Sequence, residues 1–180
     1  MNLDALKAAL PEHAKDLKLN LGAVLRSEHL SEAQVWGAAL ASAYAARHGD
    51  TIRALENEAA AHLDEAGLRA ARAASSIMAM NNVYYRFTHL VHDDDVTKLP
   101  ARLRMQVIAK PGVPAQDFEL WSLAVSAING CGMCMDSHTQ KARGEGLKPE
   151  AVQDVIRVAA VVHAVAVTLE GEAARATAAA

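Results

Sequence analysis

The sequence predicts an all-α protein, and three observations lead to this prediction. Alanine supplies 39 of the 180 residues, whereas aromatic residues make up 4% and there are only five prolines. Alanine is the strongest helix former, while strands favour aromatic and β-branched residues. Almost every segment also repeats its apolar residues with the period of a helix face rather than with the alternation of a strand. We expect one helical domain over residues 1–180, which is long enough to build a full hydrophobic core.

Prolines, glycines and capping residues divide this pattern into helices. Pro11 separates two short N-terminal helices. Ser31 and Gln34 have the spacing of a capping box, so a long helix should begin there and stop at Gly49. Asn129-Gly130 should end a later helix just before the next begins at Cys131. The expected helices cover residues 3–10, 17–25, 31–48, 51–63, 65–85, 100–110, 117–129, 131–144 and 149–169.

The remaining segments are expected to be irregular. Residues 89–100 contain three consecutive aspartates and indicate a solvated acidic connection, and residues 111–114 (Pro-Gly-Val-Pro) break the chain. The alanine-rich residues 173–180 should fray. Residues 158–167 are the longest apolar stretch. Since a membrane span needs about 20 apolar residues, we expect a buried core helix here, with His163 as a hydrogen-bonded core histidine.

Two long apolar helices show a weak internal echo. Val35-Trp36, followed by residues 41–43 (Ala-Ser-Ala), resembles Leu120-Trp121, followed by residues 125–127 (Val-Ser-Ala). Duplication of a helical unit would explain the echo, although alanine richness alone could produce it. The sequence therefore predicts a helical core with an internal duplication as one of two explanations.

Charge and the N-terminal sequence restrict the partners and the location. The net charge is −3 and the isoelectric point is near 6.2, so no basic surface is expected to neutralise phosphates, and nucleic acid is excluded as a partner. Residues 1–4 do not begin a signal peptide. We expect a soluble, cytoplasmic protein without membrane contact.

The two cysteines, Cys131 and Cys134, are the sharpest feature of the composition. In a reducing cytosol, a lone close pair is rarely a structural staple and is more often a redox or metal motif. On a helix that begins at Cys131, both cysteines and His138 share one face. A helix N-terminus and a Cys-x-x-Cys arrangement both lower the pKa of a thiol. Cα atoms three residues apart on a helix lie roughly 5 Å apart, which allows a disulfide.

The same segment supplies candidates for proton transfer. An imidazole at His138, one turn after Cys134, could take or return a proton. Glu119, at the start of the preceding helix, could point its carboxylate at the same place and orient the imidazole. The position nearest the helix N-terminus favours Cys131 as the reactive thiol, whereas the spacing to His138 favours Cys134.

Other interpretations of these residues stay open at this point. The cysteines and a histidine could bind zinc, although structural zinc sites need four ligands in a recognisable spacing. They could also be inert buried cysteines, although Asp136 and Ser137 make the neighbourhood polar. His89 and His92 are attributed to the solvated loop. The methionines are expected to pack in the core or to line the site: Met78, Met80, Met105, Met133 and Met135.

Residues 118–134, Phe-Glu-Leu-Trp-Ser-Leu-Ala-Val-Ser-Ala-Ile-Asn-Gly-Cys-Gly-Met-Cys, resemble the alkyl hydroperoxide reductase D family of the carboxymuconolactone-decarboxylase-like superfamily. Residues 77–86 and 103–114 resemble it too. The resemblance implies an all-helical homotrimer with a duplicated core. We expect no bound cofactor or metal. The resemblance also implies a lipoyl-dependent peroxidase that supports a partner peroxiredoxin, with dihydrolipoamide, carried on a lipoylated protein, as the external reductant.

The resemblance also implies roles for the site residues. Cys134 would attack the peroxide, and Cys131 would be the proton donor and the resolving, reductant-accessible thiol of a redox-active disulfide. From its spacing to Cys134, we expect His138 to act as the base, with Glu119 holding the imidazole. Some members carry a histidine directly before the second cysteine, where this chain has Met133, so a relay here must use Glu119 and His138.

Two other functions remain alternatives. A lactone decarboxylase belongs to the same superfamily, but its chemistry does not need a Cys-x-x-Cys pair. A thiol redox sensor or disulfide-exchange adaptor would be oxidised once but would not turn over with excess dithiol. Counting turnovers therefore separates an enzyme from a sensor.

Overall fold

The computed structural model describes residues 1–178, and within them the chain is all-α, as predicted, with no strand. The elements in chain order are α1 (Leu3–Ala8), the 3-10 turn η1 (Glu12–Ala14), α2 (Lys15–Val24), α3 (Glu32–Ala46), α4 (Gly49–Ala59), α5 (Glu65–Leu90), α6 (Asp94–Thr97), α7 (Gln106–Ala109), α8 (Ala115–Ile128), α9 (Gly132–Gly144) and α10 (Pro149–Ala178).

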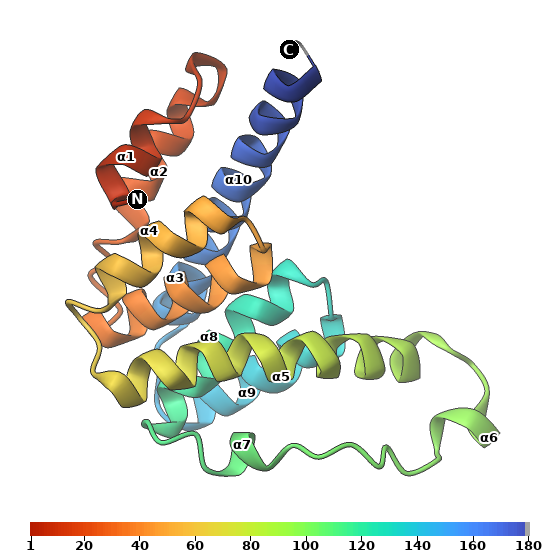
Figure 1. The fold of residues 1–180 in the computed structure, drawn as a ribbon. Helices are drawn as coiled ribbons and strands as arrows, with labels where there is room; N and C mark the ends of the chain where they lie inside the picture. Colours follow the sequence, from red (N-terminus) through yellow and green to blue (C-terminus); the bar gives the residue numbers. More distant parts are fainter. Residues whose placement is uncertain (179–180) are drawn as a thin grey trace.

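The core is formed where α3, α5, α8 and α10 pack together, while α1, α2 and the C-terminal half of α10 project to one side (Figure 1). The helices α3, α4 and α5 make the same main contacts as α8, α9 and α10, taken in the same order. The α3–α4 packing corresponds to α8–α9, the α3–α5 packing to α8–α10, and the α3–α10 packing to α8–α5. The helix contacts therefore repeat between the two halves, which agrees with duplication, one of the two explanations of the sequence echo.

The two echoing helices meet at Gly37 on α3. A Cβ atom at this position would lie 2.0 Å from Cε2 of Trp121 on α8, so only glycine admits the indole ring. The ring nitrogen of Trp121 donates a hydrogen bond of 3.2 Å to the carbonyl of Gln34, and the side chain is buried. This close packing holds α8, which carries Glu119, firmly against the core.

The start of α3 is as predicted, but its end is not. Ser31 and Gln34 form the expected capping box. However, α3 ends at Ala46, with Arg47 in the left-handed conformation (φ 64°), and Gly49 begins α4 instead of ending α3. The difference arises because the imidazole of His48 caps α4 by accepting the backbone N–H of Thr51, a cap that the sequence pattern did not indicate.

The region between α5 and α8 departs further from the prediction. Helix α5 runs five residues past the expected end, and a one-turn helix, α6, occurs in the segment expected to be irregular. Of the helix predicted over residues 100–110, only Gln106–Ala109 is helical. No side chain in residues 100–110 is buried, so no packing face stabilises a longer helix there.

Helix α10 is longer than predicted. It reaches Ala178, so residues 173–178 of the expected frayed tail are helical, and residues 179–180 lie outside the described part of the chain. By length and composition alone this one helix could cross a membrane, and 39% of its apolar window is buried. Val158 and Val162 lie on the buried face that packs against α3 and α8. The prediction for His163 was wrong, because it lies outside the buried stripe and is exposed.

Candidate active site

The turn between α8 and α9 places both cysteines at a helix N-terminus. Gly130 takes the left-handed conformation (φ 69°), which a residue with a side chain adopts at greater cost. The N–H of Cys131 then donates a hydrogen bond of 3.1 Å to the carbonyl of Ser126. As a result, Cys131 is the N-cap of α9, and Cys134 lies in its first turn.

A disulfide joins Cys131 to Cys134, and the two Cα atoms are 5.3 Å apart. The backbone N–H of Cys134 points at Sγ of Cys131 over 3.4 Å. Free N–H groups and the helix dipole at this end stabilise a negative charge. When the disulfide is reduced, Cys131 is therefore placed to hold a thiolate.

His138, one turn further along α9, is paired with Glu119 from α8. Its Nδ1 lies 2.6 Å from Oε2 of Glu119, and both side chains are buried. Lys141 lies 3.4 Å from the other carboxylate oxygen. Burial alone would raise the pKa of the Glu119 carboxyl, but the hydrogen bond and charge of His138, together with Lys141, hold that pKa below its usual value. An ionised carboxylate only accepts hydrogen bonds, so Nδ1 carries the proton.

The other nitrogen of His138 faces a methionine. Its Nε2 lies 3.2 Å from Sδ of Met78, which comes from α5. The imidazole is therefore held between Glu119 and Met78. The sequence analysis expected Met78 to pack in the core or to line the site. It did not predict this contact with the imidazole, because a contact across 60 residues leaves no local spacing signal.

A cavity of about 330 Å³ opens on this cluster. Five of its ten lining residues are methionine, isoleucine or tyrosine: Met78, Tyr85, Met105, Ile108 and Met133. Cys134 and His138 also line it. The expectation that methionines line the site is thus confirmed for three of them. Met133, at the position where some relatives of the motif have histidine, is 44% exposed at the cavity edge.

The two cysteines differ in access. Cys131 has no exposed surface, whereas Cys134 forms part of the cavity wall. The resemblance implied a reductant-accessible Cys131, and in the disulfide form that expectation is not met. The reason is local, because the side chain of Cys131 caps α9 from inside the α8–α9 turn.

Asn81 on α5 is a further cavity residue that the sequence analysis did not single out. Its side chain is 4% exposed, and its Oδ1 is buried without a hydrogen-bond partner among the described residues. A polar Asn81-Asn82 pair inside a long, mostly apolar helix is the signal that could have indicated it. Across residues 1–178, no three His, Cys, Asp or Glu side chains are grouped so that they could hold a metal ion.

The class of protein is defined by this helical fold together with its cysteine pair. Residues 94–179 match the family described as "Carboxymuconolactone decarboxylase family". The matched region spans α8 and α9, and it therefore includes every site residue except those that α5 contributes.

Relatives similar over nearly the full length narrow the assignment. The chain is 59% identical to a protein named "Alkyl hydroperoxide reductase AhpD" from Rhodospirillum centenum, over 97% of this chain and 94% of that protein. It is 54% identical to proteins of the same name from Streptomyces coelicolor (96% of this chain, 97% of that protein) and Hyphomonas neptunium (97% of each). The chain belongs to the AhpD family of the carboxymuconolactone-decarboxylase-like superfamily, as the residues of the α8–α9 motif predicted.

Proposed function

We propose that this protein is a thiol peroxidase that reduces alkyl hydroperoxides through Cys131 and Cys134. One observation carries the proposal: Cys134 is disulfide-bonded to Cys131 and lines an apolar cavity together with a histidine that is held by a buried carboxylate. The names of the relatives, alkyl hydroperoxide reductase, support it.

The first step oxidises Cys134. Its thiol gives a proton to Nε2 of His138, and the thiolate attacks the terminal oxygen of the hydroperoxide. The O–O bond breaks, the sulfur becomes a sulfenic acid, and the alkoxide leaves as the alcohol after taking the proton back from His138. Nε2 lies against Met78 in the disulfide form, so the ring must turn away from that sulfur before Nε2 can take the proton.

The second step forms the disulfide. The thiol of Cys131 attacks the sulfenic sulfur, and the hydroxyl group leaves as water with the thiol proton. The cysteines are joined within one helical turn, so this step needs no movement of α9. Peroxide is thereby reduced to alcohol and water, and the cysteine pair holds the oxidising equivalents.

A dithiol, which we infer to be dihydrolipoamide on a lipoylated protein, restores the thiols. One of its sulfurs attacks Cys134, which the cavity reaches, and Cys131 leaves as a thiolate at the helix N-terminus. The second sulfur then releases Cys134 and closes a disulfide within the reductant. The apolar walls of the cavity suit the hydrocarbon part of such a dithiol. We further propose that reduced Cys131 and Cys134 pass electrons by exchange to a cytoplasmic peroxiredoxin.

We infer that the protein acts as a homotrimer, as the family resemblance implies. Three large apolar side chains lie on one face of α5, spaced four and three residues apart: Val83, Phe87 and Leu90, which are 62%, 45% and 64% exposed. A grouped apolar surface of this kind marks an interaction site. Light scattering should give three times the 19.1 kDa chain mass, and a single chain mass at micromolar concentration would refute the trimer.

The peroxidase proposal is tested by turnover. The purified protein is mixed with cumene hydroperoxide and excess dihydrolipoamide, and the loss of both compounds is followed. We expect equimolar consumption of peroxide and dithiol over many cycles. Oxidation that stops after one equivalent would indicate a redox sensor instead of an enzyme, and no peroxide-dependent oxidation of the dithiol would refute the proposal.

A further inference from the structure

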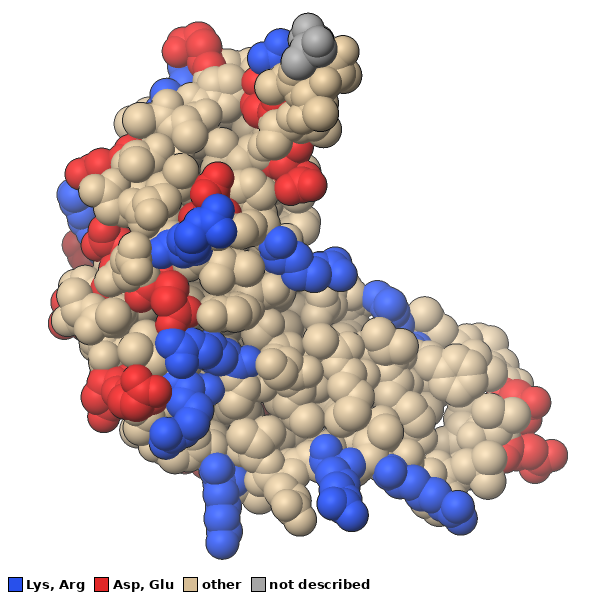
Figure 2. Space-filling view, viewed as in Figure 1, with Lys and Arg blue, Asp and Glu red and all other residues tan. Residues whose placement is uncertain are grey.

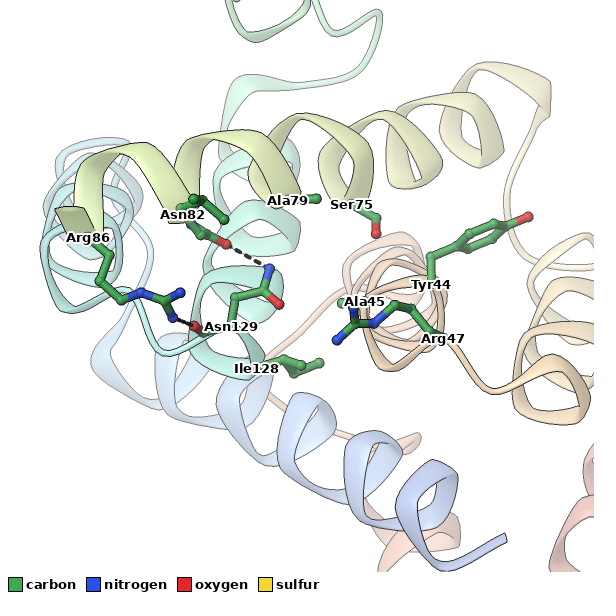
Figure 3. A pocket seen from close by; sticks show the side chains of 10 residues that line it. Tyr44, Ala45, Arg47, Ser75, Ala79, Asn82, Arg86, Ile128 and Asn129 are labelled. Atoms are coloured by element: carbon green, nitrogen blue, oxygen red, sulfur yellow. Dashed lines mark hydrogen bonds between the residues drawn. The ribbon is translucent and has the colours of Figure 1, made fainter. Parts of the chain in front are cut away.

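A second cavity lies on a neighbouring face of α5, between the C-terminal end of α3 and the α8–α9 turn (Figure 3). Its volume is about 400 Å³. Its lining residues include two arginines and no acidic residue. The mechanism proposed above does not use this cavity.

The two arginines reach the cavity from different helices. Arg86 on α5 donates one hydrogen bond of 2.7 Å to the backbone carbonyl of Asn129, which leaves its other donors available. The guanidinium of Arg47, at the end of α3, approaches the same region from the opposite side (Figure 3). No carboxylate within residues 1–178 forms an ion pair with Arg47 or Arg86. In the space-filling view, basic side chains lie in the hollow between the C-terminal part of α10 and the C-terminal part of α5 (Figures 1 and 2).

The backbone of Arg47 indicates that its placement has a cost. At φ 64° it occupies the left-handed conformation in which helices ordinarily end on glycine. A residue with a side chain is strained there, and such strain tends to persist where it serves a site. The chain thus places a guanidinium where glycine would be the more stable choice.

The wall between the arginines combines apolar side chains, such as Val83 and Ile128, with a hydrogen-bonded polar row. Nδ2 of Asn129 donates to Oδ1 of Asn82 over 3.0 Å, and Nδ2 of Asn82 donates to Ser126 over 2.9 Å. The hydroxyl of Ser75 also faces the cavity (Figure 3). We propose that this cavity binds a small anion with two carboxylate or phosphate groups, which Arg47 and Arg86 hold from opposite walls. Planar guanidinium groups bind both kinds of group through paired hydrogen bonds.

Calorimetric titration of the full-length protein with two probes, succinate and inorganic pyrophosphate, tests this proposal. We expect saturable binding of at least one probe, with one site per chain. Binding of succinate would indicate a dicarboxylate ligand, and binding of pyrophosphate would indicate a phosphate ligand. Arg47→Gly and Arg86→Gln should each weaken binding at least about ten-fold. Arg104→Gln, at an exposed arginine outside the cavity, should not weaken it.

Arg47→Gly also separates binding from folding. Glycine relieves the left-handed strain, so the melting temperature should stay the same or rise while binding is lost. The proposal is overturned if neither probe binds saturably, or if binding survives Arg47→Gly.

A different observation supports a second proposal, which rests on the proposed peroxidase function. Asn81 is buried in the wall of the active-site cavity, and its Oδ1 has no partner among the described residues. An unpaired buried oxygen destabilises the fold unless a ligand or water satisfies it. We infer that Oδ1 of Asn81 accepts the O–H of the bound hydroperoxide and so holds the terminal oxygen toward Cys134.

The two half-reactions, followed separately by stopped flow, test this role. In Asn81→Leu, the hydroperoxide concentration that gives a half-maximal rate of oxidation of the reduced protein should rise about ten-fold, because one hydrogen bond to the substrate is lost. Reduction of the disulfide by dithiothreitol should be unchanged, and the melting temperature should not fall. Unchanged oxidation kinetics in Asn81→Leu would overturn the role of Asn81. A wild-type protein that no hydroperoxide oxidises would refute the peroxidase function itself, and this role with it.

Discussion

Nδ1 of His138 on α9 lies 2.6 Å from Oε2 of Glu119 on α8, and both side chains are buried beside the cavity that Cys134 lines. The contact joins the two helices that build the site. It also fixes which imidazole nitrogen carries a proton and leaves the other, now against Met78, for exchange with a substrate or thiol.

Loss of the imidazole should slow peroxidase turnover while the helical fold is kept. General acid–base groups contribute about 10²–10⁴-fold to rates, so His138→Phe should lower peroxidase turnover by roughly that factor. Glu119→Phe should lower it somewhat less, because the imidazole remains but is no longer held. Steady-state assays measure the effect, with the helical circular-dichroism signal as the control. Turnover that survives His138→Phe would exclude it as the base.

The pair should also make stability depend on pH. The pKa of the Glu119 carboxyl is lower in the folded protein than its unfolded value of 4.5. Its contribution is therefore complete above pH 4.5 and is lost as the pH falls through the folded pKa. Urea unfolding from pH 7 downward should show a smaller loss of stability in Glu119→Gln than in the wild type. Parallel curves for the two proteins would contradict the ion pair.

Asp117 should behave in the opposite way. It is buried, and burial raises the pKa of its carboxyl above the usual 3.8, while a 2.8 Å hydrogen bond from Gln34 partly lowers it. Ionisation at neutral pH therefore costs stability, and this cost disappears below pH 3.8, where the folded and unfolded forms are both protonated. Asp117→Asn keeps the acceptor for Gln34, so it should be more stable than the wild type at pH 7. The difference in stability between the variant and the wild type should decrease toward pH 3.8. Equal stability of the two proteins at pH 7 would contradict the raised pKa of Asp117.

The features that the sequence predicted correctly depend on residues close to one another along the chain. The capping box of Ser31 and Gln34 needs only four consecutive residues, and it is present. The spacing along one helix predicted that Cys131, Cys134 and His138 lie together. The disulfide between the two cysteines and the common cavity of Cys134 and His138 are observed, whereas Cys131 lies outside the cavity wall.

The unpredicted parts depend on contacts between distant segments. Asn81 reaches the cavity from α5, 50 residues before Cys131, so no spacing rule joins it to the site. Met78 was expected to pack in the core or to line the site, but its contact with His138 could not be read from spacing. The helix predicted over residues 100–110 is mostly absent, because the sequence pattern could not show that none of these side chains is fully buried. Helix α3 ended early because His48 caps α4.

The contact between α3 and α8 should make Gly37 intolerant of any side chain. In Gly37→Ala the new methyl group would meet the Trp121 ring at 2.0 Å, and overpacking of this kind costs about 1–3 kcal/mol. Gly171→Ala on α10 is the matched control, because nothing lies within 4 Å of its added Cβ. That substitution should stabilise the helix by about 0.5–1 kcal/mol. Denaturant unfolding of both variants measures the difference, and equal shifts would show that the Gly37 contact relaxes freely.

The most direct test of the central claim is mass spectrometry of the reduced protein after one equivalent of hydroperoxide. The wild type should lose two hydrogens as the disulfide between Cys131 and Cys134 forms. Cys131→Ser should gain one oxygen atom on Cys134, because no resolving thiol remains. The mass of Cys134→Ser should not change. If Cys134→Ser still reacted stoichiometrically with the peroxide, or if the wild type kept its two hydrogens, the assignment of Cys134 as the peroxide-attacking residue would be contradicted.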